Sequence, residues 1–75
     1  MNWQTYITAT PDVLFGKPVI RGTRIPVDLI LEKLGKGATR TYLLEAYPRL
    51  TDEAINACLL MASDSVSHER IVELA

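Results

Sequence analysis

Apolar residues recur at helical spacing in the middle of the chain. The positions at i, i+3, i+4 and i+7 are Val27, Ile30, Leu31 and Leu34. This period is that of an amphipathic helix, and the run begins directly after Pro26, a residue favoured at helix starts. Gly37, which can adopt positive φ, follows its end. The pattern therefore predicts a helix from about residue 27 to 34.

Two further helices are predicted between residues 39 and 63. Thr39 can cap a helix over residues 40–46, which Pro48 stops, and Thr51 can cap a third helix from residue 52 to about 63. The second helix is expected to turn Leu43, Leu44 and Tyr47 inward. At 100° per residue, the third should turn Ile55, Leu59, Ala62 and Val66 inward, with Cys58 beside them. Its outer face should hold Glu53, Asn56, Ala57, Leu60 and Asp64.

The N-terminal third alternates in the manner of β-structure. Residues 3–8 predict a strand with Trp3, Thr5 and Ile7 on one face, paired with the following hairpin or with the same segment of a second copy. Residues 19–21 and 24–26 predict two short arms of that hairpin. Gly22 and Thr23 suit its turn, with glycine at the first position.

These elements predict a mainly α fold. Three helices joined by short turns have the spacing of a homeodomain-like helix-turn-helix bundle, here preceded by a short strand and a β-hairpin. One domain is expected over residues 1–75, with a strand and hairpin region at 1–26, a three-helix core at 27–63 and a C-terminal segment at 64–75. A short helix from Ser67 onward would dock through Ile71, Val72 and Leu74.

Composition narrows the classes of function. One cysteine, Cys58, and one histidine, His68, exclude an intramolecular disulfide and leave no ligand set for zinc, so we expect no metal, no cofactor and a reducing cytoplasm. No signal peptide or membrane span is expected. Cys58 is interpreted as a small core residue, and His68 is expected in a different element. We therefore expect that the protein is not an enzyme and has no catalytic residue.

Charge is distributed unevenly along the chain, which has a net charge of −1. Residues 1–49 have seven basic and four acidic residues, whereas residues 50–75 have one basic and five acidic residues. Phosphate contacts are therefore expected from the first half, and Asn56 is the residue on the third helix suited to an adenine edge. The candidate DNA-binding residues are Lys17, Arg21, Arg24, Arg40, Arg49 and Asn56. Each cation also suits an ordinary solvated surface.

Other residues indicate contact with protein. The apolar arc of the third helix is wide, its outer face contains acids and no Lys or Arg, and such a face would be repelled in the major groove. The residues expected at a dimer or partner interface are Trp3, Ile7, Leu60 and Met61.

Several motifs match a known family. They are GKPVIRGTRIPV at residues 16–27, Gly37, YPRLT at 47–51 and the helix start DEAI at 52–55. Over about residues 6–62 the chain closely resembles domain-of-unknown-function family 433. The resemblance implies a small prokaryotic protein with a homeodomain-like helix-turn-helix fold, often a homodimer. Such proteins are commonly described as antitoxins encoded beside a ribonuclease-like toxin of the PIN class.

Two hypotheses follow. The first is an antitoxin-like transcriptional regulator, a homodimer that binds its own operator DNA and a PIN-like toxin. The second is a protein-binding module that neutralises a toxin or another partner without binding DNA, with Arg21 and Arg24 engaging acidic groups. The salt dependence of binding distinguishes the two hypotheses. Binding to phosphates weakens steeply as ionic strength rises, whereas binding through apolar contacts changes little.

Overall fold

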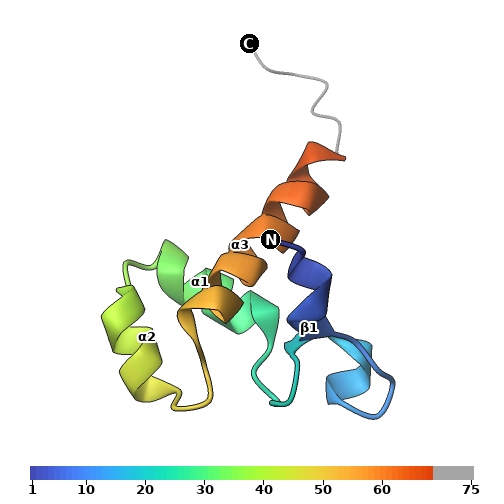
Figure 1. Ribbon diagram of the computed structural model, residues 1–75, viewed down its shortest axis with the longest axis horizontal. Helices are drawn as coiled ribbons and strands as arrows, with labels where there is room; N and C mark the ends of the chain where they lie inside the picture. The colour runs from blue at the N-terminus through green and yellow to red at the C-terminus, as the bar shows by residue number, and fades with distance from the viewer. Residues whose placement is uncertain (69–75) are drawn as a thin grey trace.

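Three helices stacked beside a small N-terminal layer make up the protein (Figure 1). A computed structural model describes residues 1–68. The chain forms, in order, η1 (Trp3–Thr5), β1 (Ile7–Thr8), η2 (Leu14–Gly16), β2 (Val19–Ile20), α1 (Val27–Gly35), α2 (Arg40–Ala46) and α3 (Asp52–Ser67). The predicted fold class is confirmed, since the protein is mainly helical, with three helices after a short antiparallel strand pair.

The helix starts agree with the capping signals in the sequence. Pro26 precedes α1 with extended backbone, and Gly37 closes the following turn at a φ of 98°. The Thr39 hydroxyl accepts a 3.0 Å hydrogen bond from the Tyr42 amide, and the Thr51 hydroxyl accepts one of 3.1 Å from the Ala54 amide. Because both threonines satisfy otherwise unpaired amides, α2 and α3 begin where predicted.

Helix α3 is longer than predicted and reaches Ser67. Residues 52–67 contain no glycine or proline, so nothing in the sequence breaks the helix near residue 63. At its end the Ser67 hydroxyl donates a 2.9 Å hydrogen bond to the Asp64 carbonyl. Ser67, expected to start a fourth helix, therefore belongs to α3, and Ile71, Val72 and Leu74 lie outside the described residues.

The buried face of α3 differs from the predicted one. Ala57, expected outside, is fully buried, whereas Leu59 is 41% exposed and Val66 is 64% exposed. The prediction was wrong because it centred the face on the large residues. The small side chains of Ala54 and Ala57 turn toward the core and allow the helices to approach closely.

The N-terminal strand is shorter than predicted. Trp3 and Thr5 belong to the turn of η1, because the Asn2 side chain caps that turn by accepting a hydrogen bond from the Gln4 amide. Only Ile7 and Thr8 remain extended, opposite Ile20 and Val19 of β2. The expected pairing with the hairpin region is confirmed.

The predicted reversal after β2 is present with a different register. The Thr23 amide donates a 3.0 Å hydrogen bond to the Ile20 carbonyl, which places Arg21 and Gly22 at the centre of the turn. Gly22 supplies the required positive φ of 79°. The second arm is reduced to one bridge, between Val19 and Pro26, because proline has no amide to extend the ladder.

One apolar core joins these elements. Its buried members come from β1, β2, all three helices and the loop before α3, and they are Ile7, Ile20, Val27, Ile30, Leu43, Leu50, Ala54, Ile55, Ala57 and Cys58. The core lies against the first half of α3, and the last turns of α3 extend beyond α2 (Figure 1). Within residues 1–68, none of the helices is both long and apolar enough to cross a bilayer.

Candidate functional site

Arg21 fastens the N-terminal segment to the turn after β2. Its Nε donates to the Thr5 carbonyl at 3.1 Å, and its Nη2 lies 3.3 Å from the Gln4 carbonyl and 3.4 Å from the Ile7 carbonyl. These acceptors are uncharged, so the positive charge of the guanidinium is retained. Arg21 is therefore a fixed cation, and part of its hydrogen-bonding capacity holds the fold.

Lys17 and Arg40 form ion pairs with acidic residues of this chain. Lys17 Nζ lies 2.9 Å from Asp28 Oδ2, and its hydrogen bond holds the pKa of that carboxyl below its usual value. Arg40 Nη1 lies 3.3 Å from Asp52 Oδ1, and Arg40 Nη2 donates a 2.7 Å hydrogen bond to Asn56 Oδ1. Two phosphate candidates and the base-reading candidate thus meet other side chains of the chain itself.

Arg24 and Arg49 complete the set of candidate cations. Both are exposed, and within residues 1–68 neither forms a side-chain hydrogen bond or an ion pair. Arg24 follows the turn after β2, and Arg49 lies in the loop between α2 and α3. The six predicted residues are therefore spread over several elements, and within residues 1–68 only Arg40 and Asn56 among them share a side-chain hydrogen bond or an ion pair.

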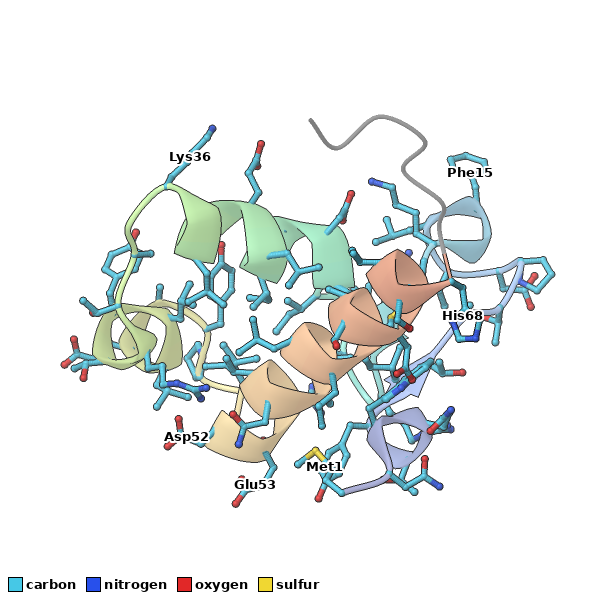
Figure 2. The ribbon with its side chains drawn as sticks, turned by 90° about the horizontal axis from the view of Figure 1, so that it is seen from above. Met1, Phe15, Lys36, Asp52, Glu53 and His68 are labelled. Carbon is cyan, nitrogen blue, oxygen red and sulfur yellow. The ribbon has the colours of Figure 1, made fainter. Side chains whose placement is uncertain are left out.

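The exposed face of α3 is acidic at its start. Figure 2 shows Asp52 and Glu53 pointing outward there, with His68 at the opposite end of the helix. Between Leu50 and His68 the sequence contains no Lys or Arg. Phosphates of a major groove around this helix would meet repulsion unless cations from other elements offset it.

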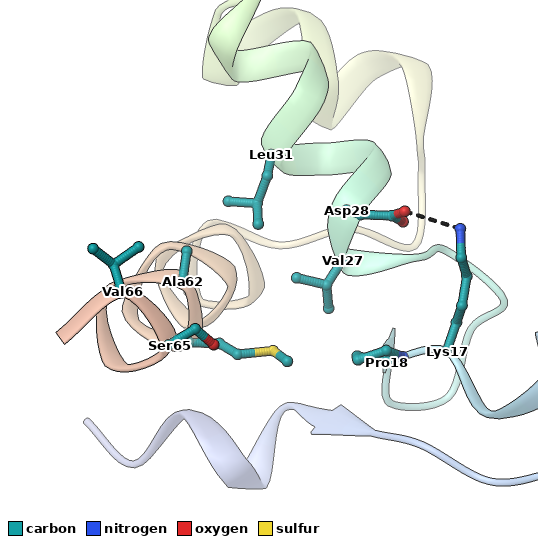
Figure 3. A pocket seen from close by; sticks show the side chains of 9 residues that line it. Lys17, Pro18, Val27, Asp28, Leu31, Ala62, Ser65 and Val66 are labelled. Atoms are coloured by element: carbon teal, nitrogen blue, oxygen red, sulfur yellow. Dashed lines mark hydrogen bonds and ion pairs between the residues drawn. The ribbon is translucent and has the colours of Figure 1, made fainter. Parts of the chain in front are cut away.

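An apolar groove lies between α1 and the second half of α3 (Figure 3). Its volume is about 310 Å³, and Val27, Leu31, Met61 and Val66 are among its lining residues. The charged groups at its edge, Lys17 and Asp28, neutralise each other. This α1–α3 groove is therefore an apolar surface with no uncompensated charge among its lining residues.

Phe15 is fully exposed, two residues before the groove begins at Lys17. It lies in a left-handed stretch in which φ is 49° at Leu14, 57° at Phe15 and 86° at Gly16. Residues that have a Cβ atom rarely adopt this backbone conformation, which costs roughly 1–2 kcal/mol per residue. Figure 2 shows the ring pointing away from the body of the protein.

The four predicted interface residues have different positions. Trp3 packs on α3, where its Nε1 donates a 2.6 Å hydrogen bond to Asp64 Oδ2. Ile7 is only 7% exposed and belongs to the core, so its assignment to an interface was wrong. Met61 lines the α1–α3 groove, and Leu60 is 40% exposed.

Cys58 and His68 belong to the same helix, and the prediction that they lie in different elements was wrong, because α3 continues to Ser67 and His68 is its C-cap. Cys58 is fully buried, and burial raises the pKa of its thiol to about 11. At neutral pH the reactive thiolate is therefore scarce. His68 Nδ1 lies 2.7 Å from the Asp64 carbonyl at the end of α3. Among residues 1–68, no group of three His, Cys, Asp or Glu side chains is arranged to hold a metal ion.

The sequence interpretation missed Phe15, Val66 and the groove itself. One signal was present for Phe15, which precedes a glycine and stands outside every predicted helix and strand. Val66 was assigned to the core because its spacing fits the apolar face of α3. Its exposure depends on which neighbouring elements cover the end of α3, which periodicity does not specify.

Together the fold and these surfaces define a small three-helix domain with an open apolar groove and scattered surface cations. The chain belongs to the family described as "Protein of unknown function (DUF433)", whose model matches residues 7–62. The family resemblance inferred from the sequence motifs is thus confirmed.

Two relatives support this assignment. The chain is 39% identical over 56 residues to "Uncharacterized protein y4eO" of Sinorhizobium fredii (strain NBRC 101917 / NGR234), a match that covers 75% of this chain and 25% of that protein. It also resembles the crystal structure of a DUF433 member from Anabaena variabilis ATCC 29413, with a TM-score of 0.78 and 36% identity, covering 85% of this chain and 63% of that one. The chain thus spans about a quarter of the curated relative's length.

Proposed function

We propose that this chain is an antitoxin-like, protein-binding module of the cytoplasm, which inserts Phe15 into an apolar pocket of a PIN-like toxin. The observation that supports the proposal best is the complete exposure of Phe15 on a left-handed stretch of backbone. An exposed aromatic ring held by strained backbone is typical of a binding site, because folding alone gains nothing from it.

The α1–α3 groove supplies the adjoining contact surface. Its apolar lining includes Leu31, Met61 and Val66, and the Lys17–Asp28 pair at its edge has no net charge. The complementary partner surface is therefore apolar and uncharged where it meets this groove. A small volume of this kind suits side chains from one helix or loop of the partner.

A homodimer is the second element of the proposal. Leu59 and Leu60 are 41% and 40% exposed at successive positions of α3, and we assign this apolar pair to contact with a second copy. The Leu60→Asp variant should sediment as a monomer under conditions where the wild-type protein is a dimer. Equal sedimentation of the two proteins would remove dimerisation from the proposal.

Operator binding is the other candidate function. It is favoured by Arg24 and Arg49, which are exposed and lack carboxylate partners within residues 1–68. The acidic start of α3 opposes it, as does the involvement of Asn56 with Arg40. We therefore place partner binding first and DNA binding second.

Fluorescence anisotropy separates these candidates. The labelled chain is titrated with the protein encoded beside its gene and, separately, with the duplex upstream of that gene, each at low and at moderate salt. Protein binding that persists at moderate salt supports the proposal, because apolar contacts are weakly screened. Preferential, salt-sensitive binding to the upstream duplex with none to the neighbouring protein would replace it with the operator-binding function.

A further inference from the structure

A second surface hollow lies between the turn after β2 and the loop before α3. Its volume is about 330 Å³, and two arginines, Arg21 and Arg49, contribute to its lining together with Tyr6 and Thr51. None of the lining residues is an aspartate or a glutamate. This Arg21–Arg49 hollow therefore combines two positive charges with no lining carboxylate to balance them.

Arg21 enters the hollow with a fixed orientation. Its three acceptors are backbone carbonyls of Gln4, Thr5 and Ile7, and its Nη1 takes no part in these contacts. A guanidinium held in this way loses little further freedom when an anion arrives, which favours binding. The fold thus provides a charged group that is already positioned.

Arg49 approaches from a loop that is anchored on both sides. The next residue, Leu50, is 5% exposed and its amide donates a 2.8 Å hydrogen bond to the Tyr47 carbonyl. Thr51 then caps α3. Because the backbone around Arg49 is held, its exposed side chain stays close to the hollow.

We infer that the Arg21–Arg49 hollow receives a carboxylate side chain of the partner protein. Arginine pairs well with carboxylates in a bidentate arrangement, and the half-buried ring of Tyr6, which also lines the hollow, offers apolar contact to the methylene groups of a glutamate. Asp52 and Glu53 follow Thr51 directly. Their repulsion would be stronger for a nucleic acid, which has many phosphates, than for a single carboxylate side chain. This inference rests on the proposed function, since it assigns the partner an acidic residue.

The test uses a single carboxylate as the probe. The full chain, labelled with ¹⁵N, is titrated at constant ionic strength with the peptide acetyl-Ala-Glu-Ala-amide and with its glutamine analogue. Amide shifts should gather at Arg21, Gly22, Arg49 and Thr51 with the glutamate peptide only. Equal shifts with the glutamine peptide would overturn the inference, as would a short DNA duplex that shifts the same amides at lower concentration.

Substitution of Arg49 gives the matched comparison, because Arg21 also holds the fold. Arg49→Ala should weaken peptide binding at least about fivefold, and Arg49→Lys should weaken it less because the charge remains. Arg24→Ala, which removes an exposed arginine that does not line the hollow, should change binding less than about twofold. Unchanged peptide affinity in Arg49→Ala would contradict the assignment.

The inference and the proposed function fail separately. Phe15→Ala leaves the hollow intact, so it should bind the glutamate peptide like the wild-type protein even if Phe15 has no role in partner binding. If the neighbouring protein fails to bind and the peptide still binds at Arg49, the hollow stands without that partner. If the partner binds and the peptide does not, the inference alone is overturned.

Discussion

Arg40 Nη2 donates a 2.7 Å hydrogen bond to Asn56 Oδ1, which links the start of α2 to the second turn of α3. The same guanidinium lies 3.3 Å from Asp52 Oδ1, one helical turn before Asn56. A side chain predicted to hold phosphate and one predicted to read a base therefore bind each other. Any DNA contact by either residue requires this pair to separate.

Removal of the Arg40–Asn56 pair should cost a modest amount of stability. Asn56→Ala and Arg40→Ala are each expected to lower the free energy of unfolding by about 0.5–1 kcal/mol, because the pair is exposed. The double variant should lose less than the sum of the two. Urea denaturation measures all three proteins, and strictly additive losses would show that the two side chains do not interact in solution.

Arg21 should matter for folding, whereas Arg24 should not. Arg21→Ala removes hydrogen bonds to three backbone carbonyls and is expected to lower the free energy of unfolding by about 1–2 kcal/mol. Arg24→Ala, two residues past Gly22, is the matched control and should stay within about 0.5 kcal/mol of wild type. Urea midpoints compare the two, and equal midpoints would refute the structural role of Arg21.

Cys58 should make stability fall at alkaline pH. Burial raises the pKa of the thiol from 9.0 to about 11, so the folded state keeps its proton while the unfolded state releases it. The contribution is complete below pH 9 and is lost as pH rises toward 11, with a total of about 3 kcal/mol at most. Cys58→Ala should lose less stability than wild type between these values, and parallel pH profiles would contradict the assignment.

Phe15 should be unfavourable for folding. Replacement by glycine relieves a φ of 57° and removes no buried contact, so Phe15→Gly should raise the free energy of unfolding by about 0.5–1 kcal/mol. Phe15→Ala keeps a Cβ atom and should not show this gain. Thermal or urea denaturation checks the difference, and a glycine variant less stable than the alanine variant would show that the left-handed stretch is not strained.

The helices were predictable because their boundaries depend on local chemistry. Thr39 and Thr51 cap α2 and α3 through hydrogen bonds within three residues, and Gly37 supplies a positive φ at one turn. The N-terminal strand was predicted too long because alternation suggested more than the local cap of Asn2 permits. The same residues can form either a turn capped by a side chain or an extended strand. The segment that pairs with the strand decides between the two, and it is not evident from the sequence alone.

The candidate site was less predictable. The cations were correctly found to lie outside the core, but their partners, Asp28 for Lys17 and Asp52 for Arg40, are more than ten residues away in sequence. Arg21 was expected to face an anion beside Arg24, and the structure places it instead against the carbonyls of η1 and β1. Long-range pairing of this kind follows from the fold. Residue type alone therefore did not distinguish arginines that hold the fold from arginines that are accessible to a partner.

The affinity of Phe15→Ala for the protein encoded beside this gene tests the central claim most directly. Because Phe15 is 100% exposed, the substitution leaves the fold intact, and circular dichroism should be unchanged. The account predicts that affinity falls by about tenfold or more, as expected for an aromatic anchor, whereas the control Tyr42→Ala on α2 binds like wild type. Wild-type affinity in Phe15→Ala would contradict the account.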